Sequence, residues 1–165
     1  MTTACDLQAT ICCIYLCFAS DVLFNTVARD KRSLCPISYS LDQFGDRWTL
    51  LILRDLILFR KRHYREFLDS GEGISTNILA DRLGRLEKSG MIRKERDPLD
   101  GKRFLYSATN KGEATLPILL EMVAWGAEYD PNTPISEEFR RRVRTDREAL
   151  AAEILERGVK ANPES

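Results

Sequence analysis

Residues 75–109, STNILADRLGRLEKSGMIRKERDPLDGKRFLYSAT, decide the fold of this 165-residue chain. Ser75 is a good N-cap for a helix that runs to about Ser89, because a serine hydroxyl accepts a hydrogen bond from an early helical N–H group. Gly90 then suits the end of the helix. Three leucines repeat at helical spacing and predict the buried face: Leu79, Leu83 and Leu86. The opposite face is polar, as on many surface helices, so this pattern alone is a weak sign of DNA binding.

A β-hairpin is predicted directly after this helix. Ile92–Arg96 and Arg103–Ser107 have the composition of strands, and Asp97–Gly101 between them is rich in turn residues. Five basic side chains lie on the hairpin: Arg93, Lys94, Arg96, Lys102 and Arg103. A basic hairpin in this position is typical of the wing of a winged helix, whose cations displace counterions from DNA phosphates. The same charges would also suit a ribbon that is merely solvated.

The residues before Ser75 complete a helix-turn-helix. A short apolar stripe of Tyr64, Phe67 and Leu68 is followed by a turn over residues 69–73. Upstream of them, Thr49–Phe59 is apolar on nearly every face, which predicts a central buried helix. Another helix is predicted to begin at Pro36, and its apolar positions are Ile37, Leu41 and Phe44.

A long helix is predicted from Thr109, as its cap, to about Tyr129, with a kink or a late start at Pro117. It carries two apolar stripes: Leu116, Leu120, Val123 and Ala127 on one side, and Ile118, Met122, Trp125 and Tyr129 on the other. One stripe can pack on the domain, so the second predicts a two-fold partner. A further helix is predicted from its cap Ser136 to about Arg157. It would clasp the partner subunit, pack on the N-terminal extension or remain a free tail.

Composition gives little support to any function. Basic and acidic residues both number 25, and residues 54–103 hold 13 basic against 9 acidic side chains, a modest local excess. Four of the five cysteines lie before residue 18, and Cys35 stands alone. This distribution is neither a disulfide framework nor a zinc pattern, and it favours a reduced, cytoplasmic protein.

The sequence shows no enzyme motif: His63 is the only histidine, and no nucleophile, carboxylate pair or phosphate-binding glycine loop is evident. No enzyme, cofactor or metal is expected, and the apolar N-terminal stretch is too short to span a membrane.

The chain resembles HxlR-type transcriptional regulators, which are relatives of MarR-type regulators. The motifs that carry the resemblance are Cys35-Pro-Ile, Phe44-Gly-Asp-Arg-Trp48, Tyr64-Arg-Glu-Phe67, Leu79-Ala-Asp-Arg-Leu83, Leu86-Glu-Lys-Ser-Gly90, Tyr106-Ser-Ala-Thr109 and Trp125-Gly126. It implies three segments: an N-terminal extension, helical or disordered, over residues 1–34, a winged helix-turn-helix domain over 35–130, and a helical tail over 131–165. The implied fold class is mainly α with one β-hairpin, in a dimer formed through the terminal helices. The wing itself is more similar to MarR-type wings than to the proline-rich wing of many HxlR-type members.

The resemblance also implies a role for named residues. The helix from Ser75 would enter the major groove of double-stranded DNA, with Asn77 suited to adenine and Arg85 to guanine. The expected DNA-binding residues are Arg65, Ser75, Thr76, Asn77, Arg82, Arg85, Lys88, Lys94, Arg96, Lys102 and Arg103. The expected dimer contacts are Leu116, Leu120, Val123 and Trp125. A homodimer of this kind would bind a pseudo-palindromic operator, and the family leans towards repression.

Cys35 is a candidate redox sensor, because some HxlR-type regulators sense oxidants or electrophiles through a cysteine just before the first helix. A helix N-terminus favours a thiolate there. Cys35 could equally well be there only as a small apolar residue that precedes a helix.

Two other functions remain open. One is control by a small aromatic or flavin-like ligand between the wing domain and the dimer helices, and the other is a winged-helix module that binds protein rather than DNA.

Overall fold

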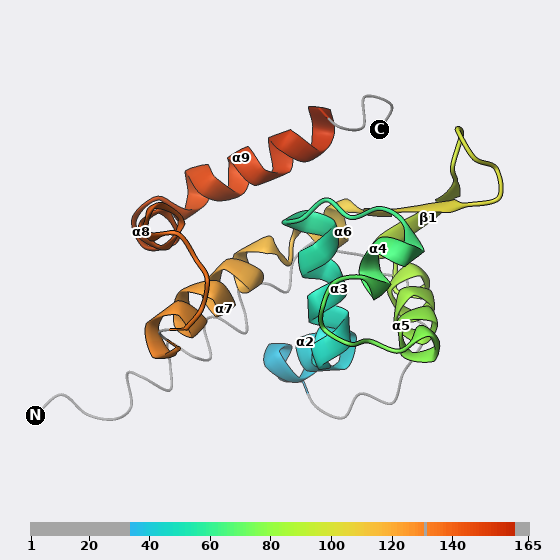
Figure 1. Ribbon diagram of the computed structural model, residues 1–165. Coiled ribbons are helices and arrows are strands. Elements are labelled where there is room, and N and C mark those ends of the chain that lie inside the picture. The colour runs from blue at the N-terminus through green and yellow to red at the C-terminus, as the bar shows by residue number, and fades with distance from the viewer. Residues whose placement is uncertain (1–33, 131, 161–165) are drawn as a thin grey trace, which may run out of the picture. The chain divides into compact units, whose positions relative to one another are not determined.

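The computed structural model describes residues 34–130 and 132–160 (Figure 1), and all of its helices and strands belong to the unit Cys35–Ser165. The predicted N-terminal extension lies outside the described residues except for Leu34. Cys5, Cys12, Cys13 and Cys17 lie outside them as well.

Two helices precede the helix-turn-helix. α2 (Pro36–Phe44) begins at the predicted proline, and Gly45 ends it. α3 (Arg47–Ile57) is capped by Asp46, whose carboxylate accepts a hydrogen bond from the Thr49 N–H at 3.1 Å. α3 is the predicted central helix, since most of its side chains are buried or half-buried. α2, in contrast, has no buried residue and exposes Ile37 and Leu41.

The helix-turn-helix consists of α4 (Tyr64–Leu68) and α5 (Thr76–Lys88). Ser75 caps α5 as predicted, because its Oγ accepts a hydrogen bond from the Ile78 N–H at 3.4 Å. The three leucines predicted to face inward are all buried. Gly90 has φ +72°, a left-handed conformation that glycine adopts without steric cost.

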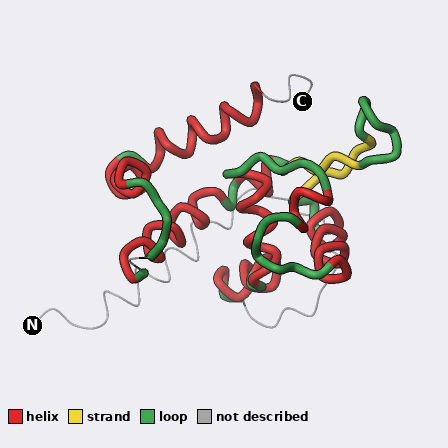
Figure 2. Tube along the Cα trace, viewed as in Figure 1, coloured by secondary structure: helices red, strands yellow, loops and turns green. Residues whose placement is uncertain are grey.

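The hairpin is an antiparallel pair of β1 (Ile92–Arg96) and β2 (Phe104–Ala108), with Arg96 opposite Phe104 (Figure 2). β2 starts one residue later than predicted. The reason is that the N–H of Arg103 closes the turn by donating to the Asp100 carbonyl at 2.8 Å.

The predicted helix after Thr109 is divided into α6 (Asn110–Glu113) and α7 (Leu116–Tyr129). Thr109 does cap the first part, as its Oγ1 accepts a hydrogen bond from the Gly112 N–H at 3.3 Å. The late start expected from Pro117 is confirmed, because α7 begins one residue before this proline, which has no N–H to donate.

The C-terminal helices are α8 (Glu137–Thr145) and α9 (Arg147–Lys160), where the sequence predicted one helix. Ser136 is the predicted cap, and the chain breaks at Asp146, which has φ −145°. Val143 and Leu150 are buried in the same core as α3, α5 and α7. The alternative of a free, solvated tail is therefore wrong for this segment, which packs against the core of its own chain.

One hydrophobic core joins the helix-turn-helix, the base of the hairpin and the C-terminal helices. Its fully buried side chains include Leu53, Ile57, Phe67, Leu79, Leu86, Met91, Leu116, Leu120 and Val143. The fold class is the predicted one, a mainly helical winged helix-turn-helix with one β-hairpin.

Candidate nucleic-acid interface

α5 presents a polar face away from the core. Because Leu79, Leu83 and Leu86 point inward, the polar residues at the intervening positions are exposed. The exposed side chains include Ser75, Thr76, Asn77, Asp81, Arg85 and Lys88. Ser75, Thr76 and Asn77 therefore lie together at the N-terminal end of this helix, and Arg85 lies about two turns further along.

Arg82 differs from the other predicted cations of α5. Its Nε donates to Asp46 Oδ1 at 2.9 Å, and its Nη1 forms an ion pair with Asp81. Burial raises the pKa of Asp46, but hydrogen bonds from Thr49 and the ion pair with Arg82 outweigh it, so this pKa lies below its ordinary value. The guanidinium of Arg82 thus joins α5 to the N-terminus of α3, whereas the resemblance implied a contact with DNA.

The wing cations are exposed, and several have partners within the wing. Arg96 donates to the Gly101 carbonyl at 2.7 Å, and Arg103 lies 3.0 Å from the Asp100 carboxylate. The ammonium of Lys94 lies 4.3 Å from the ring centroid of Phe104. Among the described residues, Lys102 has no ion-pair partner. Arg65, Arg85 and Lys88 likewise form no ion pair within residues 34–130 and 132–160.

His63 connects the helix-turn-helix to the wing, a role that the sequence did not reveal. Its Nε2 lies 3.0 Å from Asp97 Oδ2, and residue 63 forms an antiparallel bridge with Leu105 of β2. The hydrogen bond with His63 lowers the pKa of Asp97, which also accepts a hydrogen bond from the Leu99 N–H at 2.8 Å. Asp97 followed by a proline is a typical turn signal. Its contact with His63, 34 residues earlier, cannot be predicted from the residues around Asp97.

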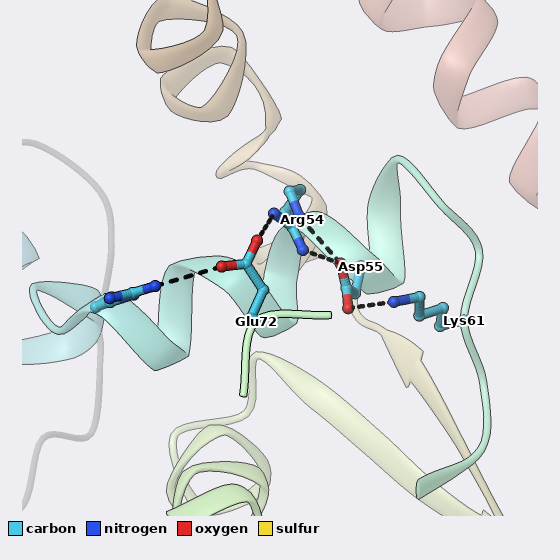
Figure 3. A network of polar contacts seen from close by, with 5 residues as sticks. Arg54, Asp55, Lys61 and Glu72 are labelled. Carbon is cyan, nitrogen blue, oxygen red and sulfur yellow. Dashed lines mark hydrogen bonds and ion pairs between the residues drawn. The ribbon is translucent and has the colours of Figure 1, made fainter. Parts of the chain in front are cut away.

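A second unexpected feature is a chain of ion pairs along α3, which we call the α3 charge network (Figure 3). It consists of Arg47, Arg54, Asp55, Lys61 and Glu72. The carboxylate of Asp55 is only 3% exposed and lies 2.7 Å from both Arg54 Nη2 and Lys61 Nζ. Arg54 Nη1 lies 2.8 Å from Glu72 Oε1, and the hydrogen bond from Arg54 lowers the pKa of Glu72. A buried carboxylate with two cationic partners satisfies the requirement that buried charges be paired.

Cys35 occupies the N-cap position of α2 and is half-buried.

The predicted dimer contacts on α7 separate into two groups. Leu116 and Leu120 are fully buried in the core of their own chain, so they would not be available to a second chain, and Val123 is half-buried beside them. Trp125 is 68% exposed and packs against Tyr129 with 5.0 Å between ring centroids and 40° between ring planes.

No group of three or more histidine, cysteine, aspartate or glutamate side chains in the described part of the chain is arranged to hold a metal ion. No helix within residues 34–130 and 132–160 is long and apolar enough to cross a membrane.

Comparison with known proteins gives a consistent picture. Residues 43–134 match the family model for the HxlR-like helix-turn-helix. The chain is 33% identical over 96 residues to the uncharacterized HTH-type transcriptional regulator sll1512 of Synechocystis sp., which covers 58% of this chain and 70% of that protein.

Two solved structures are similar in fold and sequence. A protein from Porphyromonas gingivalis W83, assigned to the MarR family of transcriptional regulators, is 33% identical with a TM-score of 0.51, over 62% of this chain and 99% of that one. The redox regulator HypR in its oxidized form is 27% identical with a TM-score of 0.52, over 57% of this chain and 96% of that one.

Proposed function

Since the chain belongs to the HxlR-like helix-turn-helix family of transcriptional regulators, we propose that it binds double-stranded DNA sequence-specifically and represses transcription. The observation that carries this proposal is the exposed outer face of α5 beside a basic wing. α5 enters the major groove, and the wing lies over the adjacent phosphate backbone or minor groove. Occupation of the operator then excludes RNA polymerase.

The base contacts come from two parts of α5. Ser75, Thr76 and Asn77 meet base edges at the N-terminal end of the helix, and Asn77 has the amide geometry for a bidentate pair with adenine. Arg85 is exposed and has no ion-pair partner among the described residues, so its guanidinium is available for the O6 and N7 atoms of guanine.

The phosphate contacts come from the other exposed cations of the predicted DNA-binding set, which are Arg65, Lys88, Lys94, Arg96, Lys102 and Arg103. Arg103 can exchange Asp100 for a phosphate at low cost, because exposed ion pairs contribute little to stability. Arg82 acts indirectly, through its link to Asp46, which keeps α5 in place on α3.

The regulator acts as a homodimer on a pseudo-palindromic operator with half-sites about one helical turn apart. Support comes from α7, whose outward side exposes Trp125, Tyr129, Met122 and Ile118. An apolar strip of this extent suits a second copy of the chain, related by a two-fold axis. The interface proposed for α7 thus centres on Trp125, with Val123 at its edge.

Replacing Arg85 by alanine is expected to weaken binding to the operator by about 1–3 kcal/mol, roughly 5- to 150-fold, because one bidentate base contact is lost. Binding to an unrelated duplex should change little. The measurement is a gel-shift titration on the DNA that flanks this chain's own gene, with an unrelated duplex of equal length, at two salt concentrations.

The matched control is Arg141→Ala, which removes the same side chain from the exposed face of α8. It should leave both affinities unchanged. An equal loss on both duplexes for Arg85→Ala would contradict a base contact. An affinity for DNA that does not fall at the higher salt concentration would contradict binding through phosphates. The absence of binding to either duplex would favour the protein-interaction module.

We further propose that oxidants or electrophiles release the regulator from DNA by modifying Cys35. Two facts support this: Cys35 lies half-buried at the N-cap position of α2, and the similar protein HypR is a redox regulator. Hydrogen peroxide would transfer one oxygen atom to the sulfur and leave as water, and a quinone would add the sulfur to its ring.

Cys35→Ser is expected to bind the operator like the unmodified chain and to stay bound when peroxide or benzoquinone is added. The gel-shift assay under reducing and oxidising conditions measures both properties. Release of the variant at the same oxidant concentration would disprove the role of Cys35.

A further inference from the structure

The α3 charge network holds the helix-turn-helix on both sides of α4. Before α4, the Lys61 ammonium lies 2.7 Å from Asp55, and the Lys61 N–H donates to the Asp55 carbonyl at 3.0 Å. After α4, Glu72 lies 2.8 Å from Arg54 (Figure 3). Both ends of the segment that contains α4 are therefore tied to α3.

The turn around Glu72 has little conformational preference of its own. Gly71 has φ +81° and Gly73 has φ +73°, and glycine has more accessible backbone conformations than any other residue. The side chain between the two glycines is therefore one of the anchors that hold this turn, beside the buried Ile74. Glu72 is held by two arginines of α3, at 2.8 Å from Arg54 and 3.4 Å from Arg47.

The Arg54 guanidinium is itself held in one orientation. Its Nε and Nη2 donate to Asp55 Oδ1 at 2.9 and 2.7 Å, which leaves Nη1 directed at Glu72. Asp55 is buried, so this arginine is positioned from within the core. A guanidinium offers its donors in a rigid planar fork, and a lysine could not bridge the two carboxylates in this way.

The position of Glu72 is passed on to α5. Ser75, the N-cap of α5, follows three residues later, and Thr76 is the first residue of the helix. A displaced turn would therefore move the end of α5 that holds Ser75, Thr76 and Asn77. Hydrogen bonds to base edges weaken steeply when their geometry changes, whereas attraction to phosphates tolerates such shifts.

We infer that Glu72 is a positioning residue for sequence-specific DNA binding: through Arg54 and Arg47 it sets the place at which α5 begins. The inference rests on the proposed function. Glu72 is 28% exposed at its side chain and Arg54 24%, and pairs this accessible contribute little to overall stability. The loss of Glu72 should therefore change recognition far more than folding.

The test compares Glu72→Gln with Glu156→Gln, which removes the same charge from the exposed side of α9, away from the proposed DNA-binding face. Within the described residues Glu156 forms no ion pair. Glu72→Gln is expected to lower the affinity for the upstream duplex of this chain's own gene about tenfold relative to Glu156→Gln, with equal affinities for an unrelated duplex. The melting temperatures of the two variants should be similar.

Hydrogen exchange provides a second measurement that needs no DNA. The amides of Ile78 and Leu79 donate to the Oγ and carbonyl of Ser75, so they report on the start of α5. They should exchange faster in Glu72→Gln than in Glu156→Gln. Unchanged exchange overturns the inference. If exchange rises but the unmodified chain does not distinguish the two duplexes, the proposed function fails, while the role of Glu72 in placing α5 stands.

Discussion

Phe67→Ala is expected to lower the free energy of unfolding by about 3–5 kcal/mol, the usual cost of removing a fully buried phenylalanine. Phe67 is 2% exposed and is the one buried side chain of α4. Its ring meets Tyr106 of β2 edge-on, with 6.0 Å between centroids and 80° between planes. It therefore joins the helix-turn-helix to the wing. Urea unfolding followed by circular dichroism measures the loss, and the gel-shift assay should show that DNA binding is lost with it.

The matched control is Phe59→Ala, because Phe59 is 61% exposed and stacks only loosely on Arg54, at 5.3 Å. This variant should lose less than about 1 kcal/mol. If both phenylalanine variants lost the same amount, the packing of α4 against the wing would be refuted.

Leu150→Ala is expected to cost about 2–4 kcal/mol of unfolding free energy, because Leu150 of α9 is 4% exposed and belongs to the common core. The same truncation at Leu99, which is 96% exposed in the wing, should change stability by less than about 0.5 kcal/mol. The two variants are compared by their midpoints in urea at an unchanged slope. A Leu150 variant as stable as the Leu99 variant would mean that the C-terminal helices do not pack on the core.

The secondary structure followed closely from local signals. Ser75, Thr109 and Ser136 each cap a helix, and these caps depend on hydrogen bonds to backbone groups three residues away. The break between α6 and α7 was expected from Pro117, whereas the break at Asp146 was not. Periodicity continues across Asp146, so the apolar pattern does not reveal the second break.

The candidate interface was predictable in its location but less so in its members. The outer face of α5 followed from the leucine spacing, which leaves Asn77 and Arg85 exposed. The sequence could not show that Arg82 pairs with Asp46, because the two residues are 36 positions apart and meet only when α5 packs on α3. The same reason explains why the His63–Asp97 pair was missed.

The sequence by itself determined the order of the elements, the helix-turn-helix and its wing, because caps, turns and apolar spacing act over a few residues. Only the tertiary structure decided which of the two apolar stripes of α7 is buried and what covers it. It placed Leu116 and Leu120 in the core with α8 and α9, and it left Trp125 exposed. It also decided which charged side chains remain available, because ion pairs such as Arg54–Glu72 form between residues that only packing brings together.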